Sequence, residues 1–178
     1  IVALFVAIVA PLLALLAAQA VRTWRVPRLI IGLVLLPLFI PGVSMGLATA
    51  LFFRQLGIEP SILTMIIVQV LWALPFAFLI ILTAMANFDP VYLEAAHMSG
   101  AGPLRAFFEV ELPQIGQGLL GAAIFSLIIS FNETIRTSLV QGGQNTLPTY
   151  LWAQYQQVGL SPTLHALMSV LIVATLGL

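Results

Sequence analysis

The sequence predicts an all-α membrane protein whose chain crosses the bilayer several times, and two observations lead to this fold class. Hydrophobic residues make up 61% of the 178 residues and charged residues only 7%, whereas a soluble domain carries about 25% charged residues. So few charges cannot cover a water-facing surface, and we therefore expect the surface to face lipid. The apolar residues also form runs of the roughly 20 residues that a membrane-crossing helix needs.

Five apolar runs are expected to be the spans of one bundle, without a domain boundary between them. They cover about residues 1–21, 29–53, 61–86, 114–140 and 161–178. Pro37 and Pro41 lie in the second run and Pro75 in the third, and each removes a backbone hydrogen bond, so we expect bends there. Because Ile1 already lies inside an apolar run, we expect further residues upstream of it.

Arginine is distributed unevenly over the connections between these runs. Arginines are most frequent in the connection over 22–28, and another, Arg105, lies in the connection over 87–113. The connection over 54–60 holds Arg54, and that over 141–160 holds none. Because cytoplasmic connections are enriched in arginine and lysine, we expect 22–28 and 87–113 to face the cytoplasm.

The composition also argues against several classes of function. All basic residues are arginine, so the chain lacks the lysine with which a P-loop binds ATP. If ATP drives this protein, another subunit must hydrolyse it. Without cysteine, and with His97 and His165 far apart, the sequence favours no metal site, no bound cofactor and no enzymatic activity. A net charge of zero gives no overall field to attract nucleic acid.

The connection over 87–113 contains helix signals of its own. Asp89 is a suitable N-cap and Pro90 suits the first helical position. Gly100 is expected to end this helix in a left-handed conformation. A helix over about 91–99 is on the order of 15 Å long and too short to cross a membrane. A second short helix is expected to begin at Pro103.

These residues carry a resemblance to a known family. Glu94-Ala95-Ala96, then Gly100, then Val110 and Leu112-Pro113 are similar, in identity and spacing, to the EAA motif of permeases of binding-protein-dependent ABC importers. The family has isoleucine where Val110 stands and often aspartate in place of Ser99. Four further segments resemble the spermidine/putrescine-type branch: 41–46, 88–89, 130–133 and 146–148. Members of that branch have six spans, so the resemblance implies one more before Ile1.

The resemblance also implies partners and a coupling site. In such permeases the short helix docks on a cytoplasmic ABC ATPase dimer, which binds ATP and Mg²⁺. A second, homologous permease completes a heterodimer, and an external binding protein delivers the solute to this inner-membrane complex. The residues expected to couple the chain to the ATPase are Glu94, Ala95, Ala96, Gly100, Ala101, Leu112 and Pro113.

The fourth apolar run holds the polar residues expected to line a path for a solute. Ser126, Ser130, Glu133 and Thr137 are spaced to share one helical face, with Asn132 and Arg136 alongside. Polar side chains within a span usually face the bundle interior or water. Glu133 and Arg136 either brace one another or meet the solute. In the polyamine branch this place holds acidic residues, so Arg136 leaves open a polyamine-like solute, another small amine, a zwitterion or an anion.

Two other classes of protein are alternatives. An ion-coupled carrier or channel subunit would place acidic residues or broken helices near the bilayer midplane, where these runs are nearly free of charge. An intramembrane hydrolase would need an activated serine, and no serine has a recognisable nucleophile context; we expect His165 to serve packing. Trp72 and Trp152 are expected to anchor spans at the membrane interface, with a cation–π contact as the alternative.

Overall fold

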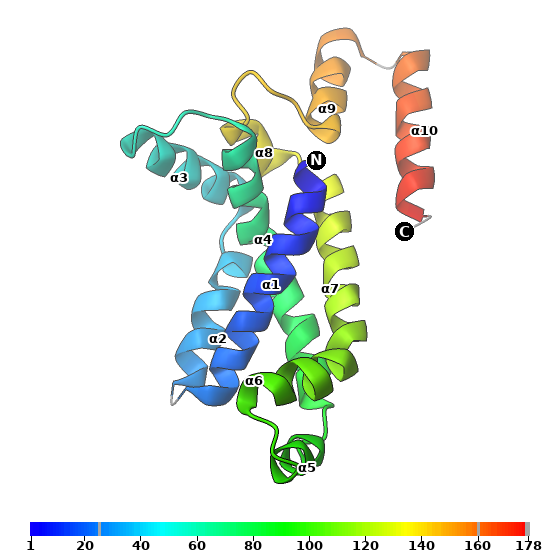
Figure 1. Cartoon of the computed structure of the whole chain (residues 1–178). Helices are drawn as coiled ribbons and strands as arrows, with labels where there is room; N and C mark the ends of the chain where they lie inside the picture. The colour runs from blue at the N-terminus through cyan, green and yellow to red at the C-terminus, as the bar shows by residue number, and fades with distance from the viewer. Residues whose placement is uncertain (25, 160, 177–178) are drawn as a thin grey trace.

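The computed structural model describes residues 1–24, 26–159 and 161–176, and this part of the chain contains helices and no strand (Figure 1). Three helices form the centre of the molecule: α1 (Val2–Thr23), α4 (Ile62–Ala86) and α7 (Leu112–Phe131). Each pair among them is in contact along the bundle. The predicted all-α fold class is therefore confirmed.

Small residues let these three helices approach closely. Ala14 and Ala18 of α1, Ala77 of α4 and Ala122 of α7 are fully buried in one core cluster. Gly118 of α7 lies so near α4 that a Cβ atom there would be 2.4 Å from the Cβ of Ala84. In lipid, helices associate through close van der Waals packing, because lipid tails are as apolar as the side chains. The central bundle therefore depends on residues with little or no side chain.

The second apolar run folds as two helices with a sharp bend between them. Helix α2 (Pro27–Leu35) continues into the 3₁₀ turn η1 (Leu36–Phe39), and α3 (Gly42–Gln55) then leaves at an angle of 106°. Ile40 is extended, with φ of −95° and ψ of 124°, because the ring of Pro41 disfavours the helical region for the residue before it. The bend expected from Pro37 and Pro41 is confirmed, whereas α4 continues through Pro75 as one helix.

The fourth apolar run differs from its prediction at both ends. A helical rod begins with α6 (Pro103–Ala106), passes through the π-helical turn η2 (Phe107–Glu111) and continues as α7 to Phe131. The chain then leaves the helix at residues 132–134, and α8 (Ile135–Val140) is a separate short helix. The Asn132 side-chain amide donates to the carbonyl of Ile128 at 3.0 Å and so satisfies one of the free carbonyls at the end of α7.

The remaining helices lie outside the central bundle. Helix α5 (Val91–Met98) lies beyond one end of it, and α9 (Leu147–Val158) and α10 (Pro162–Leu176) stand near the other (Figure 1). Helix α9 falls within the connection expected over 141–160. Residues 177–178 of the fifth apolar run lie outside the described residues.

Length and hydropathy identify fewer spans than the five expected from the sequence. Among the described residues, α1, α4 and the rod Pro103–Phe131 are long and apolar enough to cross a membrane. The bent pair Pro27–Phe39 and Gly42–Gln55 makes a fourth span if it is counted as one. Helix α10 is a shorter apolar helix of 15 residues within the described part of the chain.

The contact between Gly118 and Ala84 predicts how the bundle responds to one added methyl group. We expect Gly118→Ala to lower the stability of the folded protein by about 1–3 kcal/mol, because α4 and α7 must separate to admit the Cβ atom. Gly116→Ala is the matched control, since a Cβ there meets nothing within 4 Å and alanine favours the helix. Thermal unfolding in detergent measures both. Equal midpoints for the two variants would contradict this account of the packing.

Candidate functional site

The segment that resembles the EAA motif forms a projection at one end of the bundle. Helix α5 follows the expected boundaries, and every one of its residues is exposed or half-buried. Glu94 and Ala95 are exposed, and Ala96 and Ala101 are half-buried. Leu112 is half-buried and Pro113 exposed, at the start of α7. The exposed face of α5 is thus presented away from the bundle, at the end of the molecule (Figure 1).

Two local devices fix the ends of α5. At its start, the Asp89 carboxylate accepts a hydrogen bond from the Val91 backbone N–H at 3.0 Å. At its end, Gly100 has a φ of 85°, and the N–H of Ala101 donates to the carbonyl of Ala96 at 3.0 Å. The left-handed conformation at Gly100 and this long-reaching bond are features of a Schellman-type cap. The predicted cap at Gly100 and the second helix at Pro103 are both confirmed.

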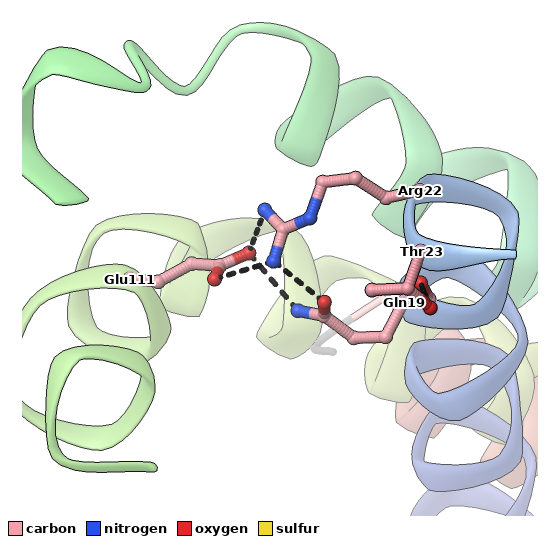
Figure 2. Close-up of polar contacts among 4 residues, drawn as sticks. All are labelled: Gln19, Arg22, Thr23 and Glu111. Atoms are coloured by element: carbon pink, nitrogen blue, oxygen red, sulfur yellow. Dashed lines mark hydrogen bonds and ion pairs between the residues drawn. The ribbon is translucent and has the colours of Figure 1, made fainter. Parts of the chain in front are cut away.

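A polar cluster that the sequence reasoning missed joins this segment to α1. Figure 2 shows Glu111, the last residue of η2, with its carboxylate directed toward Arg22 and Gln19 of α1. Arg22 donates to both carboxylate oxygens of Glu111, at 2.7 and 2.8 Å. Gln19 donates to Glu111 at 3.0 Å and accepts from Arg22 at 2.6 Å. We call these three residues the Glu111 clamp.

A second group of polar side chains is buried at the other end of the bundle. Gln69 of α4 donates to the Thr137 hydroxyl at 2.8 Å and accepts a hydrogen bond from Ser130. These three side chains are almost completely buried. Ser126, one turn before Ser130, has a buried hydroxyl without a hydrogen-bond partner among the described residues. Gln69 was also missed by the sequence reasoning, although a lone glutamine in an apolar span is a signal of such a group.

Glu133 and Arg136 form a buried ion pair beside this group. The Arg136 guanidinium donates to the Glu133 carboxylate at 2.5 Å, and the two side chains are 10% and 5% exposed, respectively. The other Glu133 oxygen accepts from the Arg136 backbone N–H at 2.8 Å. The guanidinium also lies over the Trp72 ring, 3.7 Å from its centroid. Trp72 therefore makes the cation–π contact that the sequence analysis kept as the alternative, whereas Trp152 is exposed.

The break after Phe131 changes how the expected path residues are arranged. Ser126 and Ser130 belong to α7, Asn132 and Glu133 to the break, and Arg136 and Thr137 to α8. They do not share one continuous helical face, and Asn132 is exposed. Ser130 and Thr137 nevertheless meet through Gln69. His165, expected in packing, is exposed.

A cleft adjoins the buried polar group. It has a volume of about 700 Å³ and opens among α1, α4, α7 and the segment before α9. Its polar lining includes Gln69, Ser130, Gln144, Asn145 and Thr146. The described residues offer no cluster of three or more metal-ligating side chains. Most of the lining is apolar and comes from α1, α4, α7 and α10. The arrangement therefore suits a small molecule that combines apolar parts with a few polar groups, which the amides and hydroxyls can bind.

Comparison with known proteins identifies the family. Residues 10–178 match the model of the binding-protein-dependent transport system inner membrane component. The chain belongs to this family, which consists of transport permeases rather than enzymes, and it is a multi-pass membrane protein. The family resemblance inferred from the EAA-like motif is confirmed.

Several relatives are permeases of polyamine transport systems. The chain is 25% identical to the spermidine/putrescine transport system permease protein PotC of Escherichia coli K12, over 98% of this chain and 67% of PotC. It is 24% identical to PotC of Haemophilus influenzae, over 99% of this chain and 70% of that protein. It is 27% identical to the putrescine transport system permease protein PotI of E. coli K12, over 76% of this chain and 50% of PotI. The chain thus spans about two thirds of the PotC proteins.

The buried ion pair leads to a prediction about stability. We expect Arg136→Gln alone to cost about 3–5 kcal/mol, because it leaves the Glu133 carboxylate buried and unpaired. The double variant Glu133→Gln with Arg136→Gln should recover most of this loss, since no unpaired charge remains and the amide still accepts from the backbone N–H. Thermal unfolding and membrane abundance report both. If the double variant is no more stable than Arg136→Gln, the two residues do not act as a pair.

Proposed function

We propose that the chain is the membrane-spanning permease subunit of an ATP-driven importer and forms part of the path for a small organic amine. The observation that carries this proposal is the exposed helix α5, which bears Glu94, Ala95 and Ala96 and ends at Gly100 with a φ of 85°. Within a permease family that works with binding proteins, a short exposed helix at one end of the bundle suits docking on a separate ATPase.

The chemistry of α5 supports an ATPase as its partner. Ala95 and Ala96 allow a partner surface to approach the helix closely, and the Glu94 carboxylate accepts hydrogen bonds from donors on that surface. An exposed docking helix on the arginine-rich side agrees with a cytoplasmic location. We further propose that this partner is an ABC ATPase dimer that binds ATP and Mg²⁺, and that a homologous permease and an external binding protein complete the importer.

The class of solute is proposed from the relatives and from the polar group. PotC and PotI are named for spermidine and putrescine transport, which makes a polyamine-like amine the first candidate. The Glu133 carboxylate is already neutralised by Arg136, so it offers less attraction to a polycation than a free carboxylate would. The amide and hydroxyl groups of the cleft suit hydrogen bonds to a small amine rather than strong binding by charge.

The proposed function predicts which energy source drives uptake. We expect the full-length protein, purified in mild detergent, to retain a subunit that carries a P-loop. After reconstitution with a binding protein outside, ATP inside the vesicles should drive the accumulation of radiolabelled putrescine or spermidine. A proton or sodium gradient without ATP should give none. Uptake driven by such a gradient alone would instead identify an ion-coupled carrier.

The turn at Gly100 predicts a loss of transport without loss of the protein. Gly100→Val should strain the turn by about 1–3 kcal/mol, because a β-branched residue is disfavoured at positive φ. We expect normal membrane abundance but reduced uptake per complex. Gly102→Val is the matched control, since Gly102 has a φ of −68° and ψ of 165°, and both positions have open space around a Cβ atom. Equal uptake by the two variants would refute the role given to this turn.

A further inference from the structure

The Glu111 clamp lies where residues 91–111, which we call the docking segment, meet the bundle. Glu111 ends η2 and directly precedes α7, and its side chain is 1% exposed. Arg22 is in the last turn of α1, with a side chain 41% exposed. Arg22 and Glu111 are separated by 89 positions in the sequence. The clamp is therefore a tertiary contact between α1 and η2 rather than a local feature of one helix (Figure 2).

The connectivity of the chain gives this contact a particular place. Helix α5 is joined covalently to α4 before it and, through α6 and η2, to α7 after it. Movement of α5 therefore reaches two of the three central helices along the backbone. Helix α1 is the third, and it has no such connection to α5. The clamp provides a direct polar link from the docking segment to α1.

The chemistry of the clamp suits the transfer of movement. Two parallel hydrogen bonds between a guanidinium and a carboxylate fix both distance and orientation, whereas apolar side chains in contact can slide past one another. Gln19 bonds to both partners and closes the network. The π-helical turn η2 places Glu111 at a different angle from that of an uninterrupted α-helix, and such turns occur frequently at functional sites.

We propose that Gln19, Arg22 and Glu111 are positioning residues for transport, which carry the movement of the docked segment into α1. This inference rests on the proposed function, because it requires an ATPase that moves α5. None of the three residues lines the cleft. Loss of the clamp should therefore uncouple ATP hydrolysis from solute movement, while the binding of ATP and the binding of solute are both retained.

The test uses the full-length protein in its purified complex, reconstituted in liposomes with putrescine as the probe. The double variant Arg22→Met with Glu111→Met removes the link and leaves no unpaired charge. We expect it to assemble and hydrolyse ATP, with putrescine uptake per ATP lower by at least about five-fold, the lower range of couplings between sites. Arg22→Lys keeps the charge but not the two-point bond, and should give a smaller loss with normal assembly.

Two controls match this design. Thr23→Val changes the neighbouring residue, whose hydroxyl donates only to the Gln19 carbonyl within α1, and leaves the clamp intact. Arg28→Met removes an exposed arginine on the same proposed face of the membrane. Both should keep the uptake per ATP of the unchanged protein. A second readout that needs no solute is maleimide labelling of Gln144→Cys, at the cleft, compared with the unlabelled background of the same complex without this cysteine.

The possible outcomes separate the inference from the function on which it rests. Reduced uptake per ATP, with loss of the ATP-dependent change in labelling at position 144, supports the inference. Unchanged uptake per ATP in the double variant overturns the inference. A parallel fall in assembly, ATP hydrolysis and uptake also overturns it, because such a fall is expected of a contact that only stabilises the fold. If the double variant does not assemble, unchanged putrescine uptake per ATP in Arg22→Lys is enough to overturn the inference. If ATP drives neither uptake nor a labelling change in the unchanged protein, the proposed function itself fails, and the inference fails with it.

Discussion

The close approach of α1, α4 and α7 is the constraint on which the other features depend. Alanines and Gly118 line the contacts between these helices, so the backbones lie near one another and leave little room for adjustment. A movement at one end of such a bundle is transmitted as displacement of whole helices rather than absorbed by side chains. The Glu111 clamp and the buried polar group around Gln69 are attached to this rigid centre, one at each end of α7.

The ion pairs of Glu111 and Glu133 solve the same physical problem in different ways. A charged side chain within a membrane protein is costly unless it is paired. Glu111 finds its partner on another helix, 89 positions away, and so joins two elements. Glu133 finds its partner three positions further on and also accepts from that residue's backbone N–H, so this pair shapes one short turn. The first pair is suited to connecting elements, and the second to holding Arg136 against Trp72.

The features that followed from the sequence are those with local causes. Asp89, Pro90 and Gly100 mark the ends of α5 because capping and left-handed turns depend on neighbouring residues, and Pro41 marks the bend for the same reason. The break at 132–134 was not predicted, because the polar residues around it were placed on one face of a continuous helix. The partners of Glu111 and of Gln69 were not predictable from spacing, since their contacts depend on how distant helices pack. Helix α9 did have a local signal, the capping box formed by Thr146 and Thr149, which was overlooked.

The count of residues in the π-helical turn η2 sets the direction of the side chains within that turn. In a π-helix each backbone N–H bonds to the carbonyl five residues earlier, whereas in an α-helix it bonds to the carbonyl four residues earlier. The wider turn therefore takes up one additional residue. Deleting a single residue from Phe107–Glu111 would let this turn close as a regular α-helix with little change in the rotation of the helix on either side, because the wider turn has absorbed the extra residue. The surplus residue therefore acts locally, and it sets the direction in which the side chains of this turn, Glu111 among them, leave the rod.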